Sequence, residues 1–144
     1  MLGRLARYMR IMGYDTSYPN LEISDTELIE ISKADDRILL SRDRQLCSRY
    51  IKSIYIDSDR IDEQIIQITN IERPRRELLF SRCTNCNGVL VKGDSNCREE
   101  YDPRKKDSVY HCPDCGRCYW DGTHSQNILA KLESLKVYYE AQTE

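Results

Sequence analysis

The 144-residue sequence predicts an α/β fold, in which a mostly parallel sheet with helices precedes a small cysteine-rich unit and a C-terminal helix. Two observations lead to this prediction. Helix-like and strand-like segments alternate through the first 72 residues, an order typical of a parallel sheet. Six of the seven cysteines then lie between residues 83 and 118. We therefore expect an α/β domain over residues 1–72, a cysteine-rich domain over 78–124 and a helix over 125–144.

The first segments show helical periodicity and a capping signal. Apolar residues recur at helical spacing over residues 2–12, which predicts a helix whose opposite face carries solvated arginines. A short strand is expected at 14–18. Ser24 and Glu27 fit the capping box S-x-x-E, so a second helix is expected to begin at Asp25.

The next segments complete the alternation. Residues 37–41 form a short apolar run suited to a buried parallel strand, and a short helix is expected at 43–48. A second strand is expected at 53–56, and a helix beginning near residue 58 or 59 follows it. That helix would bury Ile61, Ile65 and Ile68 on one face.

The second half of the sequence predicts a charged segment that ends the first domain, then a cysteine-rich stretch and then a helix. Pro74 lies in the charged segment 72–77 and marks the end of the first domain. From residue 125 onward an amphipathic helix is predicted, with four residues in register: Ile128, Leu132, Leu135 and Tyr139.

Four of the cysteines form two C-x-x-C pairs: Cys83 with Cys86, and Cys112 with Cys115. Zinc takes four tetrahedral ligands, and two sulfurs can reach one ion from a tight turn. A short hairpin unit buries little apolar surface, so a bound metal can supply its folding free energy. Gly88 and Gly116 follow the two pairs and permit such turns. Because four thiolates leave no open coordination position, the zinc is expected to be structural.

The cysteines also have alternative uses. A redox C-x-x-C normally sits at a strand-to-helix turn, and neither pair does. His111 and Cys118 flank the second pair and are interpreted as hairpin core or surface residues, with replacement of a zinc ligand as the alternative. Cys47 and Cys97 show no partner signal. Since no export signal is recognised, a reducing, cytoplasmic location without a disulfide scaffold is expected.

Charge and hydropathy exclude some classes of protein. The net charge of −2 argues against a general electrostatic grip on nucleic acid but allows a local basic patch. No apolar run approaches the roughly 20 residues needed to span a bilayer, so no membrane partner is expected.

Asp25 and Asp43 are candidate metal ligands. Asp25 opens a predicted helix, and Asp43 follows a predicted strand by two residues. Ligands bind at the carboxyl ends of parallel strands, where clustered carboxylates can hold Mg²⁺ or Mn²⁺. Each residue also has a purely structural explanation, because carboxylates are favoured in the first turn of a helix and at its N-cap.

A series of short motifs in order resembles a known family. The motifs are L-G-R-L-A-R (residues 2–7), G-Y-D-T (13–16), D-T-E-L (25–28), R-I-L-L-S-R-D (37–43), R-C-T-N-C-N-G (82–88), C-P-D-C-G (112–116) and Y-W-D-G-T-H (119–124). This set resembles the PIN-like ribonuclease domain with a C-terminal zinc ribbon, named after the C-terminal domain of the Mut-seven exonuclease.

The resemblance implies a PIN-like α/β fold, RNA cleavage and a divalent-metal site. Carried over by position, Asp25 and Asp43 match the acidic residues of that site. Ser41 stands where threonine is usual, and Gln45 stands where a further aspartate is common. The family pattern also begins with an aspartate-bearing strand ahead of the first helix, which this sequence does not show. A weakened or absent nuclease activity is therefore one expectation.

Three functions are compatible with these features. The first is a metal-dependent ribonuclease that uses carboxylate-held Mg²⁺ or Mn²⁺, with the ribbon aiding folding and RNA binding. Five arginines are candidates for RNA contacts: Arg4, Arg7, Arg42, Arg75 and Arg76. The alternative is a catalytically weak or inactive module that binds RNA or a ribonucleoprotein partner. A protein-interaction adaptor that uses the ribbon face is the third.

Overall fold

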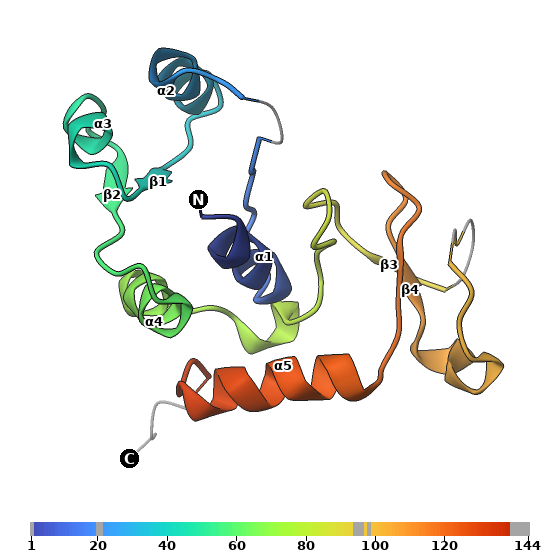
Figure 1. Ribbon diagram of the computed structural model, residues 1–144. Coiled ribbons are helices and arrows are strands. Elements are labelled where there is room, and N and C mark those ends of the chain that lie inside the picture. The colour runs from blue at the N-terminus through green and yellow to red at the C-terminus, as the bar shows by residue number, and fades with distance from the viewer. Residues whose placement is uncertain (1, 20–21, 94–96, 98, 139–144) are drawn as a thin grey trace.

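The structure, a computed structural model, describes all residues except 1, 20–21, 94–96, 98 and 139–144 (Figure 1). Its helices are α1 (Gly3–Ile11), α2 (Asp25–Ala34), α3 (Arg44–Ser48), α4 (Ile61–Ile71) and α5 (Thr123–Ser134), and its strands are β1 (Leu39–Ser41), β2 (Ser53–Tyr55), β3 (Val91–Lys92), β4 (Tyr110–His111) and β5 (Cys118–Tyr119). Two short 3₁₀ helices are η1 (Arg76–Leu78) and η2 (Pro103–Ser108). The predicted combination of an α/β fold and a four-cysteine unit is confirmed.

The parallel pair predicted from the alternation is present. β1 pairs with β2 in parallel, and Leu39 aligns with Ser53 while Ser41 aligns with Tyr55. The connecting helix α3 covers the pair. A small core of its own holds this part together, formed by Ile29, Leu39, Leu46 and Tyr50. Both strands are shorter than the segments predicted for them.

Helix α2 begins where the capping box predicts. The Ser24 hydroxyl accepts a hydrogen bond from the Glu27 amide at 3.1 Å. This bond satisfies one of the amides left without a partner at a helix start. The Ser24 hydroxyl also donates to the Glu27 carboxylate at 3.1 Å, so the cap is set locally.

The strand expected at residues 14–18 does not form. The segment is extended, but its backbone is held by side chains and lies in no ladder. The Thr16 amide donates to Oδ1 of Asn87 at 2.9 Å, and the Tyr14 hydroxyl donates to the Glu72 carbonyl. The prediction was wrong because these partners come from segments far along the chain.

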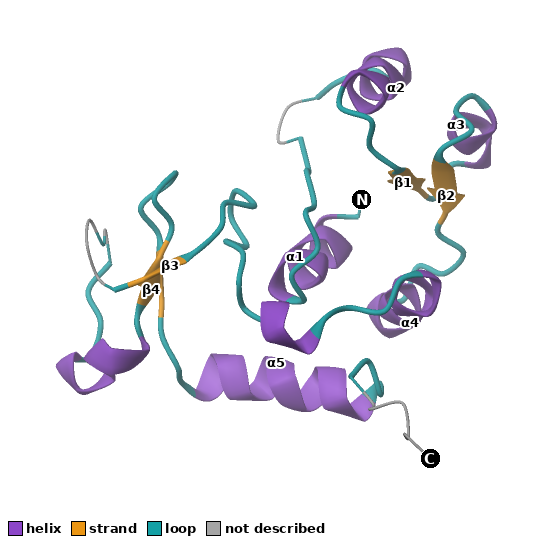
Figure 2. Cartoon of the chain, turned by 180° about the vertical axis from the view of Figure 1, so that it is seen from behind, coloured by secondary structure: helices purple, strands orange, loops and turns teal. Residues whose placement is uncertain are grey.

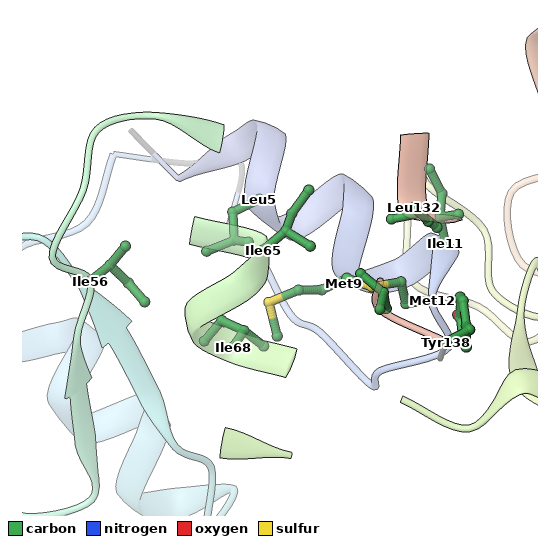
Figure 3. Packing of buried hydrophobic residues seen from close by; sticks show 10 residues of the cluster. Leu5, Met9, Ile11, Met12, Ile56, Ile65, Ile68, Leu132 and Tyr138 are labelled. Atoms are coloured by element: carbon green, nitrogen blue, oxygen red, sulfur yellow. The ribbon is translucent and has the colours of Figure 1, made fainter. Parts of the chain in front are cut away.

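The main hydrophobic core joins α1, α4 and α5 (Figure 3). Its buried members are Leu5, Met9, Ile11, Met12, Ile56, Ile65, Ile68, Leu132, Val137 and Tyr138. Helix α5 lies across α1 and α4 and packs against them, so it closes one side of the N-terminal domain (Figures 1 and 2). The predicted register of α5 is confirmed at Leu132, which is fully buried, but the helix ends at Ser134 with Leu135 as its C-cap, shorter than predicted, and Tyr139 lies outside the described residues.

The cysteine-rich unit is built from an antiparallel sheet in the order β3-β4-β5. In β4, His111 is 8% exposed and its Nδ1 lies 2.9 Å from the Gly93 carbonyl oxygen, which confirms its role as a core residue. Cys118 forms a disulfide with Cys97, their Cα atoms being 5.5 Å apart. Cys97, for which the sequence carries no partner signal, thus pairs with Cys118, a disulfide that the expectation of no disulfide scaffold did not anticipate.

None of the helices in the described part of the chain has the length and apolar character needed to cross a bilayer.

Candidate functional site

The four cysteines predicted to bind zinc lie together. Their Sγ atoms are all within 4.8 Å of one another, and the pairs Cys83–Cys115 and Cys86–Cys112 are 3.6 and 3.4 Å apart. A tetrahedron with zinc–sulfur bonds of about 2.3 Å has edges of about 3.8 Å. The donor set therefore fits a zinc ion, and these cysteines are positioned to bind a metal.

Both C-x-x-C turns have the same backbone design. In the first, the Cys83 amide donates to the Gly88 carbonyl at 2.8 Å, and the Asn87 amide donates to the Cys83 carbonyl at 2.9 Å. The equivalent two bonds of the second turn, which starts at Cys112, are each 2.8 Å long. Asn87 and Gly116 hold the same position, with φ of +74° and +79°. Asparagine and glycine are the residues that tolerate this left-handed conformation best.

A buried arginine and a tyrosine surround the cysteines. Arg10 is only 7% exposed, which corrects the expectation that the arginine face of the first helix is solvated throughout. Its Nη1 donates to the Thr84 carbonyl at 2.8 Å. The Tyr119 hydroxyl lies 3.1 Å from the Cys83 sulfur and accepts from the Thr84 amide at 3.2 Å.

The electrostatics of this shell suit an anionic metal centre. Burial lowers the pKa of Arg10, while the Cys83 and Cys86 thiolates favour its charged form and raise the pKa. Burial, followed by the hydrogen bond to Cys83, raises the pKa of Tyr119 to about 12. Four thiolates around Zn²⁺ leave a net negative charge, which the neighbouring guanidinium offsets.

The two predicted acidic residues are both exposed. Asp43 is the N-cap of α3, and its Oδ1 accepts from the amides of Gln45 and Leu46 at 2.9 and 3.2 Å. Asp25 is the first residue of α2. In the described part of the chain, the four cysteines are the only group of three or more His, Cys, Asp and Glu side chains close enough to share an ion. The structure thus does not gather Asp25 and Asp43 into such a group.

A carboxylate that was not predicted from the sequence lies at the same end of the sheet as Asp43. Asp57 follows β2 by two residues, as Asp43 follows β1, and the aligned ends of the parallel strands bring both to one edge of the sheet. Arg42 spans this edge, since its Nη2 donates to the Asp57 carbonyl at 3.4 Å. The repeated pattern of an apolar strand followed by an aspartate was the signal that could have found it.

The five arginines predicted to contact RNA lie in three places. Arg4 and Arg7 are exposed on α1, and Arg42 lies at the sheet edge. Arg75 forms an ion pair with Glu77 at 2.7 Å. Arg76 lies 3.9 Å from the Glu133 carboxylate, so the structure does not form one continuous patch from these five residues.

These features define an α/β domain joined to a four-cysteine metal-binding unit. Comparison with protein-family models shows which family this is: the chain belongs to the Mut7-C RNAse domain family, whose model matches residues 1–132. Searches of the curated proteins and of the solved structures give no significant match to the chain.

Proposed function

We propose that this chain is a PIN-like, metal-dependent ribonuclease that hydrolyses RNA phosphodiesters. The observation that carries the proposal is the family match over residues 1–132, which identifies a ribonuclease-like domain. Residues 1–72 would carry the catalytic carboxylates. The zinc ribbon at 78–124 would stabilise the fold and contact RNA, and the helix within 125–144 would stabilise the packing of residues 1–72 and the ribbon.

Asp25 and Asp43 are the proposed catalytic carboxylates. Mg²⁺ is usually held by one or two carboxylates together with waters and the phosphates of the substrate. Two exposed aspartates therefore suit an Mg²⁺ or Mn²⁺ ion that binds tightly only with RNA. The bound ion would activate water and neutralise developing charge. Asp57, at the same edge as Asp43, can position the substrate or its hydration shell.

A cleavage assay tests this proposal. Zinc-loaded protein is mixed with labelled single-stranded RNA and either Mg²⁺ or Mn²⁺. Cleavage is expected for the wild type and for Asp36→Asn, which removes another exposed carboxylate beyond the end of α2. The double variant Asp25→Asn/Asp43→Asn is expected to show only background cleavage, and unchanged cleavage would contradict the assignment.

The second candidate is an RNA- or ribonucleoprotein-binding module with weak or no catalysis. The capping role of Asp43 favours it, because its Oδ1 is already engaged by two amides. This alternative predicts RNA retention that weakens steeply with salt and no turnover with either ion.

A further inference from the structure

A pocket lined by three arginines lies where α1 meets the cysteine-rich unit. Its volume is about 390 Å³, and its lining includes Arg7, Arg10, Thr84, Asn85, Arg117 and His124. These residues come from α1, both C-x-x-C turns and the first turn of α5. None of the described residues that line it carries a carboxylate, although the whole chain has a net charge of −2.

Arg10 forms a fixed wall of this pocket. Its Nε donates to the Thr16 carbonyl at 2.9 Å and its Nη1 to the Thr84 carbonyl at 2.8 Å, while Nη2 stays outside these two bonds. With 7% of its surface exposed, the guanidinium is held in one place before any ligand arrives. A pre-ordered donor loses little conformational entropy on binding.

Two further arginines of the pocket lining are exposed. Arg7 is exposed, and Arg117 lies 3.7 Å from the Glu99 carboxylate with 45% of its side chain exposed. An exposed ion pair of this kind contributes little to the free energy of folding, so an incoming anion can replace the Glu99 carboxylate as the partner of the Arg117 guanidinium. His124 is the second residue of the 12-residue helix α5, whose N-terminal end adds partial positive charge.

We infer that this pocket binds a phosphate group of single-stranded RNA, as a substrate-holding subsite separate from the carboxylate edge. Guanidinium groups match phosphate oxygens in charge and geometry, and the pocket is large enough for about one nucleotide. The choice of RNA as the source of the phosphate rests on the proposed function. Figure 1 shows α1 between the β1–β2 pair and the ribbon. A single RNA strand bound in the pocket can therefore follow this helix toward the sheet.

Binding measurements on full-length, zinc-loaded protein test the inference. A short fluorescent single-stranded RNA is titrated without divalent ions, so that cleavage does not interfere. Arg7→Gln and Arg117→Gln are each expected to weaken binding several-fold, and the salt slope should fall by about 0.7 for each phosphate that is no longer neutralised. Arg10 is left intact because it also supports the cysteine turn.

The matched control is Arg60→Gln, which removes the same charge from a site that is 76% exposed at the start of α4. Affinities of the Arg7 and Arg117 variants equal to that of this control would overturn the inference. So would the absence of measurable RNA binding by the wild type at low salt.

Two further readouts separate the possibilities. Uridine monophosphate should displace RNA from the wild type but less effectively from Arg117→Gln, whereas equal displacement would contradict a phosphate site in this pocket. RNA binding that depends on Arg7 and Arg117 without any cleavage would support the pocket and reject the nuclease proposal. RNA cleavage by the wild type, together with RNA binding that is unchanged in Arg7→Gln and Arg117→Gln, would support the nuclease proposal and reject the pocket.

Discussion

At the residue scale, Arg10 serves both the fold and the site. Its two hydrogen bonds tie the segment after α1 to the first C-x-x-C turn, which lies 74 positions along the chain. The same guanidinium faces the cysteines and lines the basic pocket. A single buried charge thus connects the metal centre, the N-terminal helix and the proposed phosphate site.

Replacing Gly88 even by alanine is expected to destabilise the metal site. An added Cβ would lie 2.9 Å from the Cys112 sulfur and 2.6 Å from Oδ2 of Asp114. The aspartate can move aside, but the sulfur is held in place when the four cysteines bind a metal. Gly88→Ala should therefore lose about 1–3 kcal/mol of unfolding free energy and bind zinc less tightly. Thermal unfolding and zinc stoichiometry measure both effects.

Gly122→Ala provides the control, since no atom of the described residues lies within 4 Å of its added Cβ and its backbone is extended. That variant should keep wild-type zinc content. Full zinc binding by Gly88→Ala would show that the two turns can separate without harm to the metal site.

Asp15 is the second residue with a measurable role. Hydrogen bonds from Asn87 at 2.7 Å and from Arg37 at 3.0 Å hold its pKa below the usual value. A lowered pKa means that the charged form stabilises the fold above the unfolded pKa, and that this contribution is lost as pH falls through the folded pKa. Asp15→Asn should therefore cost stability at neutral pH.

The expected cost is about 0.5–1 kcal/mol, because the carboxylate is 53% exposed and screened by solvent. Urea unfolding at pH 7 and at pH 5 should give the same difference in unfolding free energy between the wild type and Asp15→Asn, since both pH values lie above the pKa of Asp15 in the folded and in the unfolded chain. Asp36→Asn, whose carboxylate is 79% exposed and pairs with Lys52, serves as the comparison. A loss of unfolding free energy no larger than that of Asp36→Asn would show that the hydrogen bonds of Asp15 do not stabilise the fold.

At the scale of elements, three helices end in the same way. The residue after the C-cap adopts a left-handed conformation in α1, α2 and α5, at Gly13, Asp36 and Lys136. In each case two amides turn back onto the last carbonyls of the helix, as Tyr14 and Gly13 do at α1. Of these three helices only α1 uses glycine, and there Leu78 lies directly against the turn.

Gly13→Ala is accordingly predicted to be more damaging than left-handed strain alone. Its φ is +99°, and an added Cβ would lie 2.5 Å from Cβ of Leu78. The strain costs about 1–2 kcal/mol and the overlap a similar amount. Gly93→Ala isolates the strain, because φ is +114° there but no described atom lies within 4 Å. Equal losses in chemical denaturation for the two variants would contradict the packing role of Gly13.

The elements that were predicted correctly are those that local chemistry decides. The α2 start follows from Ser24 and Glu27, and the clustering of four cysteines follows from two turns that each form over a few residues. The extended segment at 14–18 and the burial of Arg10 depend on the first C-x-x-C turn, about 70 positions away. Helical periodicity contains no information about such a partner.

The candidate site divides in the same way. The spacing of the cysteines predicted their cluster, and a strand followed by Asp43 predicted a carboxylate at the sheet edge. The basic pocket was not predicted, because its arginines belong to α1 and to the second turn and meet only in three dimensions. The pairing of Cys97 with Cys118 likewise depends on the hairpin that brings β5 beside residue 97.

At the scale of the molecule, helix α1 connects the main hydrophobic core with the cysteine-rich unit. The small core of Ile29, Leu39, Leu46 and Tyr50 is a distinct cluster, while Leu40 of β1 and Ile54 of β2 pack against the main core, which α1 joins to α4 and α5. On its other side, α1 contacts the cysteine-rich unit through Arg10 and the segment that follows the helix. Helix α1 is therefore one link between the metal centre and the α/β domain, beside α5, which follows the cysteine-rich unit and packs into the same core (Figure 2).

Removing the metal should reveal this route. The cysteine-rich unit buries few apolar side chains, so a chelator is expected to unfold it and lower the melting temperature. Amide hydrogen exchange should then rise across residues 83–93 and 109–119 and in 10–18, because Arg10, Thr16 and Asp15 lose their partners there. Amides of β1 and β2 should stay protected, since Leu39, Leu46 and their neighbours form a core of their own. Restoring zinc should reverse both changes, whereas uniform loss of protection would show that the two regions unfold as one unit.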